Sequence, residues 1–445
     1  MLQIALSVVC HCVNVFRRSK QGRRRVCVGS KDAARHARDA CLFTSTLVRP
    51  LLASDDKMGH HVIPQDIWRT IFEVIVDEEQ SSHVALSLMH VCKEWKAIAQ
   101  PLLYRHLRFQ KLISLEQYKD ALVQHAIQCH YPGSATHSLT VSIWDDEQDH
   151  SREHIHTILQ FNPHLRHFNF ICHGLTSNML TDLQRVGCQS LTDLHIRMSP
   201  NGLDTALHLA MLGRFAMLRH LFIMLEESGP TENASLSNAP VLDMPALATL
   251  ELTRTSDVPL SNLVRHLSHG HFPSLTALTL DLTVMEVADN IASPSVPLLP
   301  LFQNIGPQLL SLEFSAEEAR DAPRVLFPLL NKLRHLRIWM YGFDDGLGQF
   351  LPASLVKLEC EVELDNALHT QSLLQCLDDV LSRPEGGLKI DVIHVHSLVY
   401  DEFSWASIGD INPDLAGLLL ARSIRLLERG IRLEDEDGKC LGTLI

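Results

Sequence analysis

The chain of 445 residues lacks the signatures of most enzyme classes. No phosphate-binding glycine loop and no GxGxxG, HExxH or GxSxG pattern occurs, so the usual motifs of nucleotide, metal and acyl chemistry are missing. The eleven cysteines include no CxxC pair, which argues against a zinc ribbon or a disulfide framework. We therefore expect a protein that is not an enzyme, needs no cofactor, holds no metal and keeps its thiols reduced.

Long apolar runs are also missing. The stretch Met1 to Phe16 is shorter than the ~20 residues of a membrane span, and its basic run follows it, whereas a secretory signal places the charge first. We expect no membrane association, a location in the cytoplasm and/or nucleus, and a basic, disordered tail over residues 1–57. A mitochondrial or nuclear address is the alternative for this tail, and Met58 is an alternative start.

Positive charge is scarce outside that tail. Residues 1–57 hold eleven Lys/Arg against four Asp/Glu, which leaves 28 against 48 for the rest of the chain. An acidic body repels phosphate backbones, so we expect no nucleic-acid partner. The length exceeds the roughly 250 to 300 residues at which single cores stop growing, so the chain is expected to be modular or elongated.

Two amphipathic helices are predicted between residues 63 and 104. The first begins near Pro64 and carries an apolar stripe with helical spacing, formed by Ile67, Ile71, Val74 and Ile75. The acidic stretch from Asp77 to Ser82 is expected to be a loop. The second helix, which Pro101 ends, carries Val84, Leu88, Val91, Cys92 and Trp95. Helices this short bury little surface alone, so one apolar face is expected to bind a partner.

A known motif has the same residues at the same spacing. The matching residues are Ile63-Pro64, Ile67, Ile71-Phe72, Leu86, Leu88, Val91-Cys92-Lys93-Glu94-Trp95 and Pro101-Leu102-Leu103-Tyr104. This segment resembles an F-box. The resemblance implies docking on the Skp-family adaptor of a Skp–cullin–F-box ubiquitin ligase, and through it on a cullin. The implied contacts are Ile63, Pro64, Ile67, Ile71, Leu88, Val91 and Trp95. Two core helices of an unrelated α domain are the alternative.

Beyond residue 160 the chain repeats itself. A strand pattern of form L-x-x-L-x-L recurs with its first residues at Leu165, Leu191, Leu218, Leu247, Leu275, Leu309, Leu333 and Leu355. Segments between the strands, such as 203–215 and 260–267, have helical patterns. One such unit cannot bury its own apolar face, so the units are expected to stack into a solenoid.

These units resemble leucine-rich repeats, although the position that usually holds Asn or Cys is occupied by Ser199, Glu226, Thr255, Thr283, Glu317 and Tyr341. The resemblance is to the fungal-type F-box family and implies an α/β fold: a short helical F-box followed by an irregular leucine-rich-repeat α/β solenoid, or horseshoe. We expect the tail at 1–57, F-box helices at 58–107, a helical linker with the first repeat at 108–160, and the solenoid with a C-terminal cap at 161–445. A generic α/β domain with leucine-rich strands is the alternative.

The variable positions of the repeated strand are the candidate substrate-binding residues. They are Arg166, His167, Asp193, His195, Arg219, His220, Arg334, Arg337 and Trp339. The alternative is that these residues form a solvated strand surface that binds no substrate. The HxH pairs His154-Ile-His156, His269-Gly-His271 and His394-Val-His396 have the spacing of zinc ligands, but the sequence offers no third and fourth ligand near them. We expect no metal role for these pairs.

The sequence thus predicts a substrate-recognition adaptor, in which the F-box binds the Skp-family adaptor and the repeats bind an unknown protein substrate. Tethering the substrate near a ubiquitin carrier would raise its effective concentration without any chemistry in this chain. The alternative is a repeat-based scaffold that binds proteins without recruiting a ligase.

Overall fold

The computed structural model describes residues 64–79, 82–128, 132–143, 148–198, 205–225, 241–254, 261–281, 298–315, 321–340, 346–384, 386–397 and 403–440. The chain divides into two compact units, with the boundary after His106. We call residues 64–106 the helical unit and residues 107–440 the repeat unit. The tail predicted over residues 1–57, Ile63, and the six positions noted in place of the usual Asn or Cys lie outside the described residues.

The helical unit contains α3 (Gln65–Glu79), α4 (Ser82–Met89), α5 (Lys93–Ala99) and the 3-10 helix η1 (Pro101–Tyr104). Two expectations for this region are wrong. Asp77 lies inside α3 and not in a loop, because α3 continues to Glu79. The second predicted helix is two helices, because the chain turns at residues 90–92 and Cys92 starts a new one.

Cys92 is the N-cap of α5. Its backbone is extended, with φ −158° and ψ 170°, and its Sγ accepts a hydrogen bond from the backbone N–H of Trp95 at 3.4 Å. Free N–H groups at a helix start need such an acceptor. The Val-Cys-Lys-Glu-Trp segment therefore begins a helix, which periodicity alone did not reveal.

The helical unit has a small core of its own. Its buried residues are Phe72, Val76, Ala85, Ile98, Ala99 and Leu102. Trp95 lies on this core with its ring centroid 4.7 Å from that of Phe72 and 4.9 Å from that of Trp68. Aromatic pairs at such distances add about 0.5–1.5 kcal/mol to the free energy of burial, so this cluster helps to hold the short helices together.

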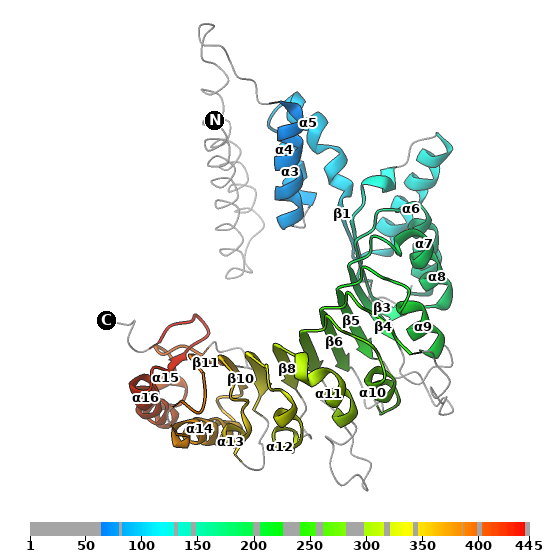
Figure 1. Ribbon diagram of the computed structural model, residues 1–445. Coiled ribbons are helices and arrows are strands. Elements are labelled where there is room, and N and C mark those ends of the chain that lie inside the picture. The colour runs from blue at the N-terminus through cyan, green and yellow to red at the C-terminus, as the bar shows by residue number, and fades with distance from the viewer. Residues whose placement is uncertain are drawn as a thin grey trace, which may run out of the picture. The chain divides into compact units, whose positions relative to one another are not determined.

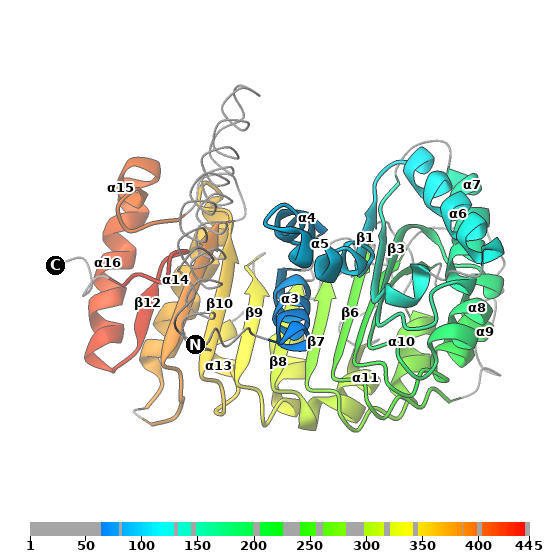
Figure 2. The same cartoon turned by 90° about the horizontal axis from the view of Figure 1, so that it is seen from above.

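The repeat unit is built on one sheet, whose strands follow each other in space in the order of the sequence (Figures 1 and 2). The strands are β1 (His106–Phe109), β2 (Ser138–Val141), β3 (His167–Gly174), β4 (Asp193–Met198), β5 (His220–Leu225), β6 (Thr249–Arg254), β7 (Ala277–Asp281), β8 (Ser311–Ser315), β9 (His335–Trp339), β10 (Lys357–Val362), β11 (Val392–Ser397) and β12 (Arg432–Glu434). From β2 to β12 every neighbouring pair is parallel.

Helices lie along one face of the sheet and connect most pairs of neighbouring strands (Figure 1). They are α6 (Leu112–Ile127), α7 (Gln148–Gln160), α8 (Ser177–Gly187), α9 (Thr205–Leu212), α10 (Ser261–Ser268), α11 (Leu299–Ile305), α12 (Ala322–Leu326), α13 (Leu347–Phe350), α14 (Ala367–Ser382), α15 (Ile408–Ile411) and α16 (Pro413–Glu428), with 3-10 turns η2 (Pro132–Ala135), η5 (Gly306–Gln308) and η6 (Phe327–Leu329). Parallel strands require such crossovers, so each repeat is one strand and its returning segment.

The repeated L-x-x-L-x-L residues build the core between sheet and helices. All three anchors of each predicted strand, from Leu165, Phe168 and Phe170 through to Leu355 and Cys360, are at most 2 % exposed. The neighbouring strands pair with anchor beside anchor, for example Leu250 beside Leu278. This stacking confirms the predicted α/β solenoid, in which each repeat covers the apolar edge of the next.

Some boundaries differ from the prediction. The sequence pattern also favours a strand over residues 388–395 and a helix over residues 411–429. The strand is β11, which spans Val392–Ser397, and the helix is α16, which spans Pro413–Glu428. The strands β1 and β12 and the helix α14 were not predicted. No helix in the described ranges is long and apolar enough to cross a membrane.

Candidate interaction surfaces

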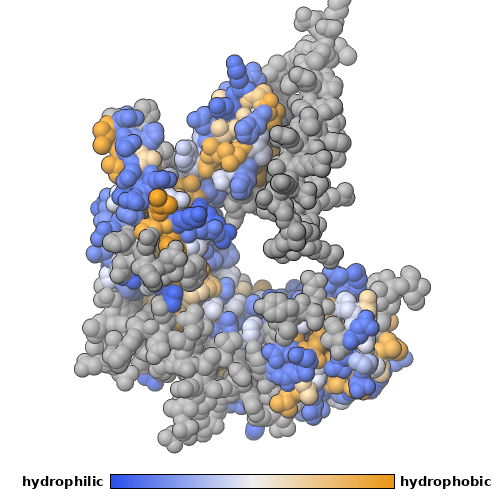
Figure 3. All heavy atoms as spheres, turned by 180° about the vertical axis from the view of Figure 1, so that it is seen from behind, coloured by the Kyte–Doolittle hydropathy of each residue, from blue (hydrophilic) through white to orange (hydrophobic). Residues whose placement is uncertain are grey.

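The helical unit exposes several large apolar side chains that its core does not use. They are Ile67, Val74, Leu86, Val91 and Tyr104, with exposed fractions between 36 and 51 %. Figure 3 shows apolar side chains gathered among hydrophilic ones on this unit. On α3 the buried face carries Phe72, Ile75 and Val76, whereas Ile67 and Val74 lie on another stripe of the helix. This exposed stripe is a candidate surface for a partner.

The residues predicted to bind an adaptor fall into two groups. Pro64, Ile67 and Val91 are exposed. Ile71, Leu88 and Trp95 are half-buried and pack against the core of the helical unit. Ile63 lies outside the described residues. Val74, which is 51 % exposed, was missing from the predicted set although the helical spacing had already placed it beside Ile71.

An ion-pair network joins the end of α3 to the end of the helical unit. Arg105 donates from Nε and an Nη atom to the two carboxylate oxygens of Asp77, at 2.5 and 2.7 Å, and Nε2 of His106 lies 2.9 Å from Oδ1. Burial raises the pKa of Asp77, but the hydrogen bonds from Arg105 and His106 outweigh it, so the pKa is below its usual value. The charged carboxylate is therefore the form that the fold stabilises.

The second candidate surface of the protein lies on the strands of the repeat unit. We call it the strand face: the face of strands β3 to β12 opposite the face that the helices cover (Figure 2). Parallel pairing in register aligns these side chains in rows that cross the strands. The middle row contains Asn169, His195, Phe222, Glu251, Thr279, Glu313, Arg337, Glu359, His394 and Glu434.

The structure separates the nine predicted substrate-binding residues into two places. The strand face contains His167, Asp193, His195, His220, Arg337 and Trp339. The other three, Arg166, Arg219 and Arg334, each come one residue before a strand and have exposed side chains. Their carbonyl oxygens accept N–H groups from the next repeat, as Arg166 does from Thr192 and Asp193. These three arginines therefore mark the edge where the strands begin.

The N-terminal part of the strand face is rich in histidine. Nδ1 of His167 lies 2.9 Å from Oδ2 of Asp193, and Thr192 donates to the same oxygen at 2.6 Å. Burial alone would raise the pKa of Asp193. The contacts with His167 and Thr192 lower it by more than burial raises it, so the pKa of Asp193 is below its usual value. Burial lowers the pKa of His195, which stacks on Phe222 with ring centroids 5.2 Å apart.

The central part of the strand face is acidic. Glu251, Asp281 and Glu313 lie on the neighbouring strands β6, β7 and β8. Burial raises the pKa of each of the three, and repulsion between carboxylates adds to this: Glu313 and Asp281 act on Glu251. Arg337 lowers the pKa of Glu313, but the pKa of each of the three carboxyl groups stays above its usual value. A cationic side chain of a partner would therefore be favoured there.

Beside the acidic section the charges alternate. Arg337 donates to Glu361 from Nε at 2.6 Å and also from an Nη atom, while its Nε lies 3.6 Å from Glu313 and 3.9 Å from Glu359. Burial lowers the pKa of Arg337, but the hydrogen bond that it donates to Glu361 and the surrounding carboxylates raise this pKa overall. The side chain of Arg337 is therefore held in place by a set of carboxylates.

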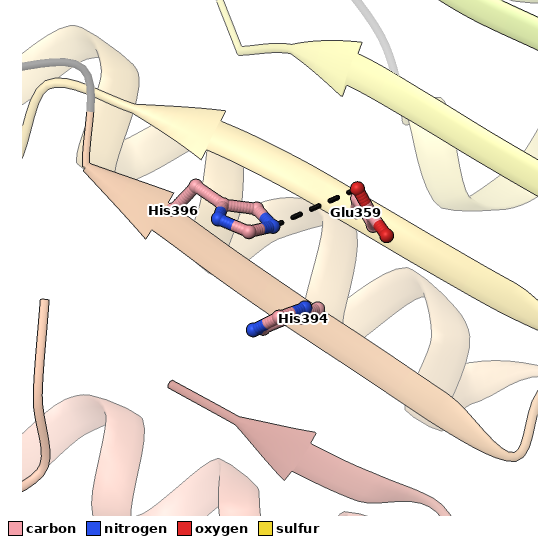
Figure 4. Close-up of side chains that lie close together, drawn as sticks. All are labelled: Glu359, His394 and His396. Carbon is pink, nitrogen blue, oxygen red and sulfur yellow. Dashed lines mark ion pairs between the residues drawn. The ribbon is translucent and has the colours of Figure 1, made fainter. Parts of the chain in front are cut away.

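Glu359 is the centre of a second cluster. It is 7 % exposed, and its Oε1 lies 2.5 Å from Nζ of Lys357 and 3.1 Å from Nε2 of His335. On the other side, Oε2 lies 3.6 Å from Nε2 of His396 (Figure 4). Contacts with His335 and His396 lower the pKa of Glu359 strongly. The carboxylate is therefore ionised at neutral pH.

The sequence did not reveal that Glu359 joins an HxH pair. Glu359 lies beside His394 in the register of β10 and β11, and His394 and His396 point to the same face of β11 (Figure 4). A signal was present: Ile390, Ile393 and Val395 repeat the anchors Leu355, Leu358 and Cys360. Aligning the two strands on these anchors places His394 opposite Glu359.

No protein-family model matches the chain, and no curated protein matches it. Among solved structures, it is similar to a Bacteroides fragilis protein from a structural genomics programme, with 12 % identity over 78 % of each chain and a TM-score of 0.35. It is also similar to the yeast complex of Rad7 and Elc1, with 14 % identity over 77 % of this chain and 94 % of that chain and a TM-score of 0.29. The assignment of an α/β solenoid does not depend on these similarities, because it follows from the strand order of this chain.

Proposed function

We propose that the protein is a non-catalytic substrate-recognition adaptor of a Skp–cullin–F-box type ubiquitin ligase. In this proposal the helical unit docks on the Skp-family adaptor and the strand face of the repeat unit binds the substrate. The observation that carries it is the match between the F-box pattern and a separate three-helix unit that leaves Ile67 and Val91 exposed. Exposed apolar side chains on so small a unit are typical of a docking surface.

The contribution of this chain would be proximity. Holding a substrate lysine close to a charged ubiquitin carrier raises its effective concentration, and no residue here needs to take part in bond making. The acidic section of the strand face, Glu251, Asp281 and Glu313, supports a substrate segment that carries Lys or Arg. Arg337 and Trp339 lie next to this section on β9.

The second candidate is a scaffold that binds proteins through its repeats and recruits no ligase. One observation favours it. Trp95, Leu88 and Ile71 pack against the core of the helical unit, so part of the predicted docking surface is used within the chain. The exposed residues Pro64, Ile67 and Val91 then decide between the two candidates.

A pull-down of the full chain with the Skp-family adaptor tests the proposal. The test variant is Ile67→Asp with Val91→Asp, because both side chains are exposed and their replacement leaves the core intact. The matched control is Arg69→Asp, which places the same new carboxylate on an exposed position of α3 outside the apolar stripe. We expect the wild type and the control to bind and the test variant to lose binding. A wild type that does not bind would contradict the ligase proposal and leave the scaffold.

A further inference from the structure

We propose that Glu359, His394 and His396 form a binding site for a divalent transition-metal ion such as Zn²⁺. One donor atom from each of the three residues lies within 4.8 Å of the other two. In the part of the chain that the structure describes, no other group of three His, Cys, Asp or Glu residues meets this condition. Two imidazoles and one carboxylate are a ligand set that zinc commonly takes in proteins.

The backbone holds the three ligands rigidly. His394 and His396 are two positions apart on β11 and therefore point to one face, and parallel register sets Glu359 of β10 beside them. Both strands lie inside the sheet, with β9 on one side and β12 on the other. Ligands on paired interior strands keep their spacing better than ligands on loops.

A hydrogen bond outside the site sets the donor atom of His394. Its Nε2 contacts the backbone carbonyl of Asp435, which can only accept a hydrogen bond, so Nε2 carries the proton. The neutral ring then keeps its lone pair on Nδ1, which is free to bind an ion. A backbone carbonyl that orients a histidine in this way is usual around metal ligands. Asp435 is itself held by the backbone N–H groups of Trp405, Asp437 and Lys439.

The carboxylate of Glu359 has one oxygen for the ion. Lys357 and His335 lie on Oε1, whereas Oε2 faces His396 at 3.6 Å. Bonds of about 2.0–2.2 Å to zinc place tetrahedral ligand atoms roughly 3.3–3.5 Å apart. The three donor atoms lie within 4.8 Å of one another, so they need to approach by at most about 1.5 Å. Three protein ligands leave a fourth position, which water would fill.

The positive charges near Glu359 oppose the binding of a metal ion, so removing one of them should raise the affinity for zinc. Lys357 contacts Glu359 directly, and Nε of Arg337 lies 3.9 Å from its Oε2. A Lys357→Gln variant removes one positive charge and keeps most of the side-chain length. It should therefore bind zinc more tightly than the wild type.

Zinc chloride titrated into the chelator-treated full chain, followed by isothermal calorimetry, tests the site. We expect the affinity to fall by more than about tenfold in Glu359→Gln and in His394→Gln/His396→Gln, since even outer partners of a metal usually contribute that much. The control is His269→Gln/His271→Gln, an exposed HxH pair in which the side chain of His271 pairs with the exposed Asp243. It should keep the affinity of the wild type.

A second readout separates binding from folding. Zinc should raise the melting temperature of the wild type and of the control, and should leave that of the two ligand variants unchanged. Circular dichroism without metal checks that each variant is folded, and His396→Gln alone serves if Glu359→Gln is not. A wild type that binds no zinc, a ligand variant with wild-type affinity, or a control that loses affinity would each overturn the inference.

Discussion

At the scale of single residues, a few polar contacts add to the six-residue core of the helical unit. Asp77 is an example, because one carboxylate receives both Arg105 and His106 from the far end of the unit. Cys92 is another, since its Sγ caps the start of α5. The sequence pattern predicted the helical character of this region but placed Asp77 in a loop. Periodicity depends on the spacing of apolar residues, so it does not reveal a polar contact such as that of Asp77 or a helix cap such as Cys92.

Replacing Asp77 with Asn should destabilise the helical unit at neutral pH. The folded-state pKa of Asp77 is below its unfolded value, so its contribution is present above the unfolded pKa and is lost as the pH falls through the folded pKa. Thermal unfolding from pH 7 downward should therefore show the wild type approaching the variant. Asp66→Asn is the control, because Asp66 is almost fully exposed. A difference that persists unchanged into strong acid would contradict this reading.

At the scale of elements, the strand pattern predicted the fold well because two requirements coincide at the same residues. The first requirement is that the L-x-x-L-x-L anchors are buried. The second is that strand and helix recur with the same period, so each repeat can bury its apolar face only by stacking on the next repeat. Register across β10 and β11 was harder to predict, because α14 lengthens that repeat and its anchors are isoleucine and valine. The Glu359 cluster depends on this register, which is why the sequence alone placed no third residue beside the HxH pair.

The acidic section of β6, β7 and β8 should cost stability. Burial and the neighbouring carboxylates raise the folded-state pKa of Glu251, so the cost appears as the pH rises through the unfolded pKa and is complete above the folded one. Glu251→Gln should raise the melting temperature at pH 7 and have little effect below the ordinary pKa of glutamate. Thr279→Ser, on the same row, is a control that leaves the charge unchanged. An equal effect of Glu251→Gln at both pH values would contradict the repulsion.

At the scale of the whole repeat unit, the C-terminal end of the solenoid needs a cap. The last strand β12 has only three residues, and α16 packs beside it. Asp435 follows β12, is 1 % exposed and accepts N–H groups from Trp405, Asp437 and Lys439. The sequence predicted a capping role for this end, where Glu434 to Gly438 have the composition of an acidic turn. It gave no indication of which carboxylate closes the turn, because burial distinguishes Asp435 from Asp437 and composition does not.

Asp435→Ala should weaken this end by a few kcal/mol, since each buried N–H left without an acceptor costs about 1–3 kcal/mol. Terminal repeats have a neighbour on one side only, so amide hydrogen exchange should speed up in β12 and β11 before it does so in the central strands. Asp437→Ala, at an exposed position of the same turn, should leave exchange close to that of the wild type. Uniformly faster exchange over all strands would show that the end is not an independent weak point.

The regular register of the strand face also sets the kind of partner it suits. Neighbouring strands lie about 4.8 Å apart, so a partner lying across them along the middle row meets a new side chain at that interval. Same-side residues of an extended peptide repeat about every 6.8 Å and fall out of step within two strands. The turns of an α-helix repeat every 5.4 Å and stay in step for longer. Glu251 and Glu313 lie two strands apart on this row, a distance of about 9.6 Å. A helical segment with basic side chains two turns apart, about 10.8 Å, is therefore the partner whose spacing best fits these two carboxylates.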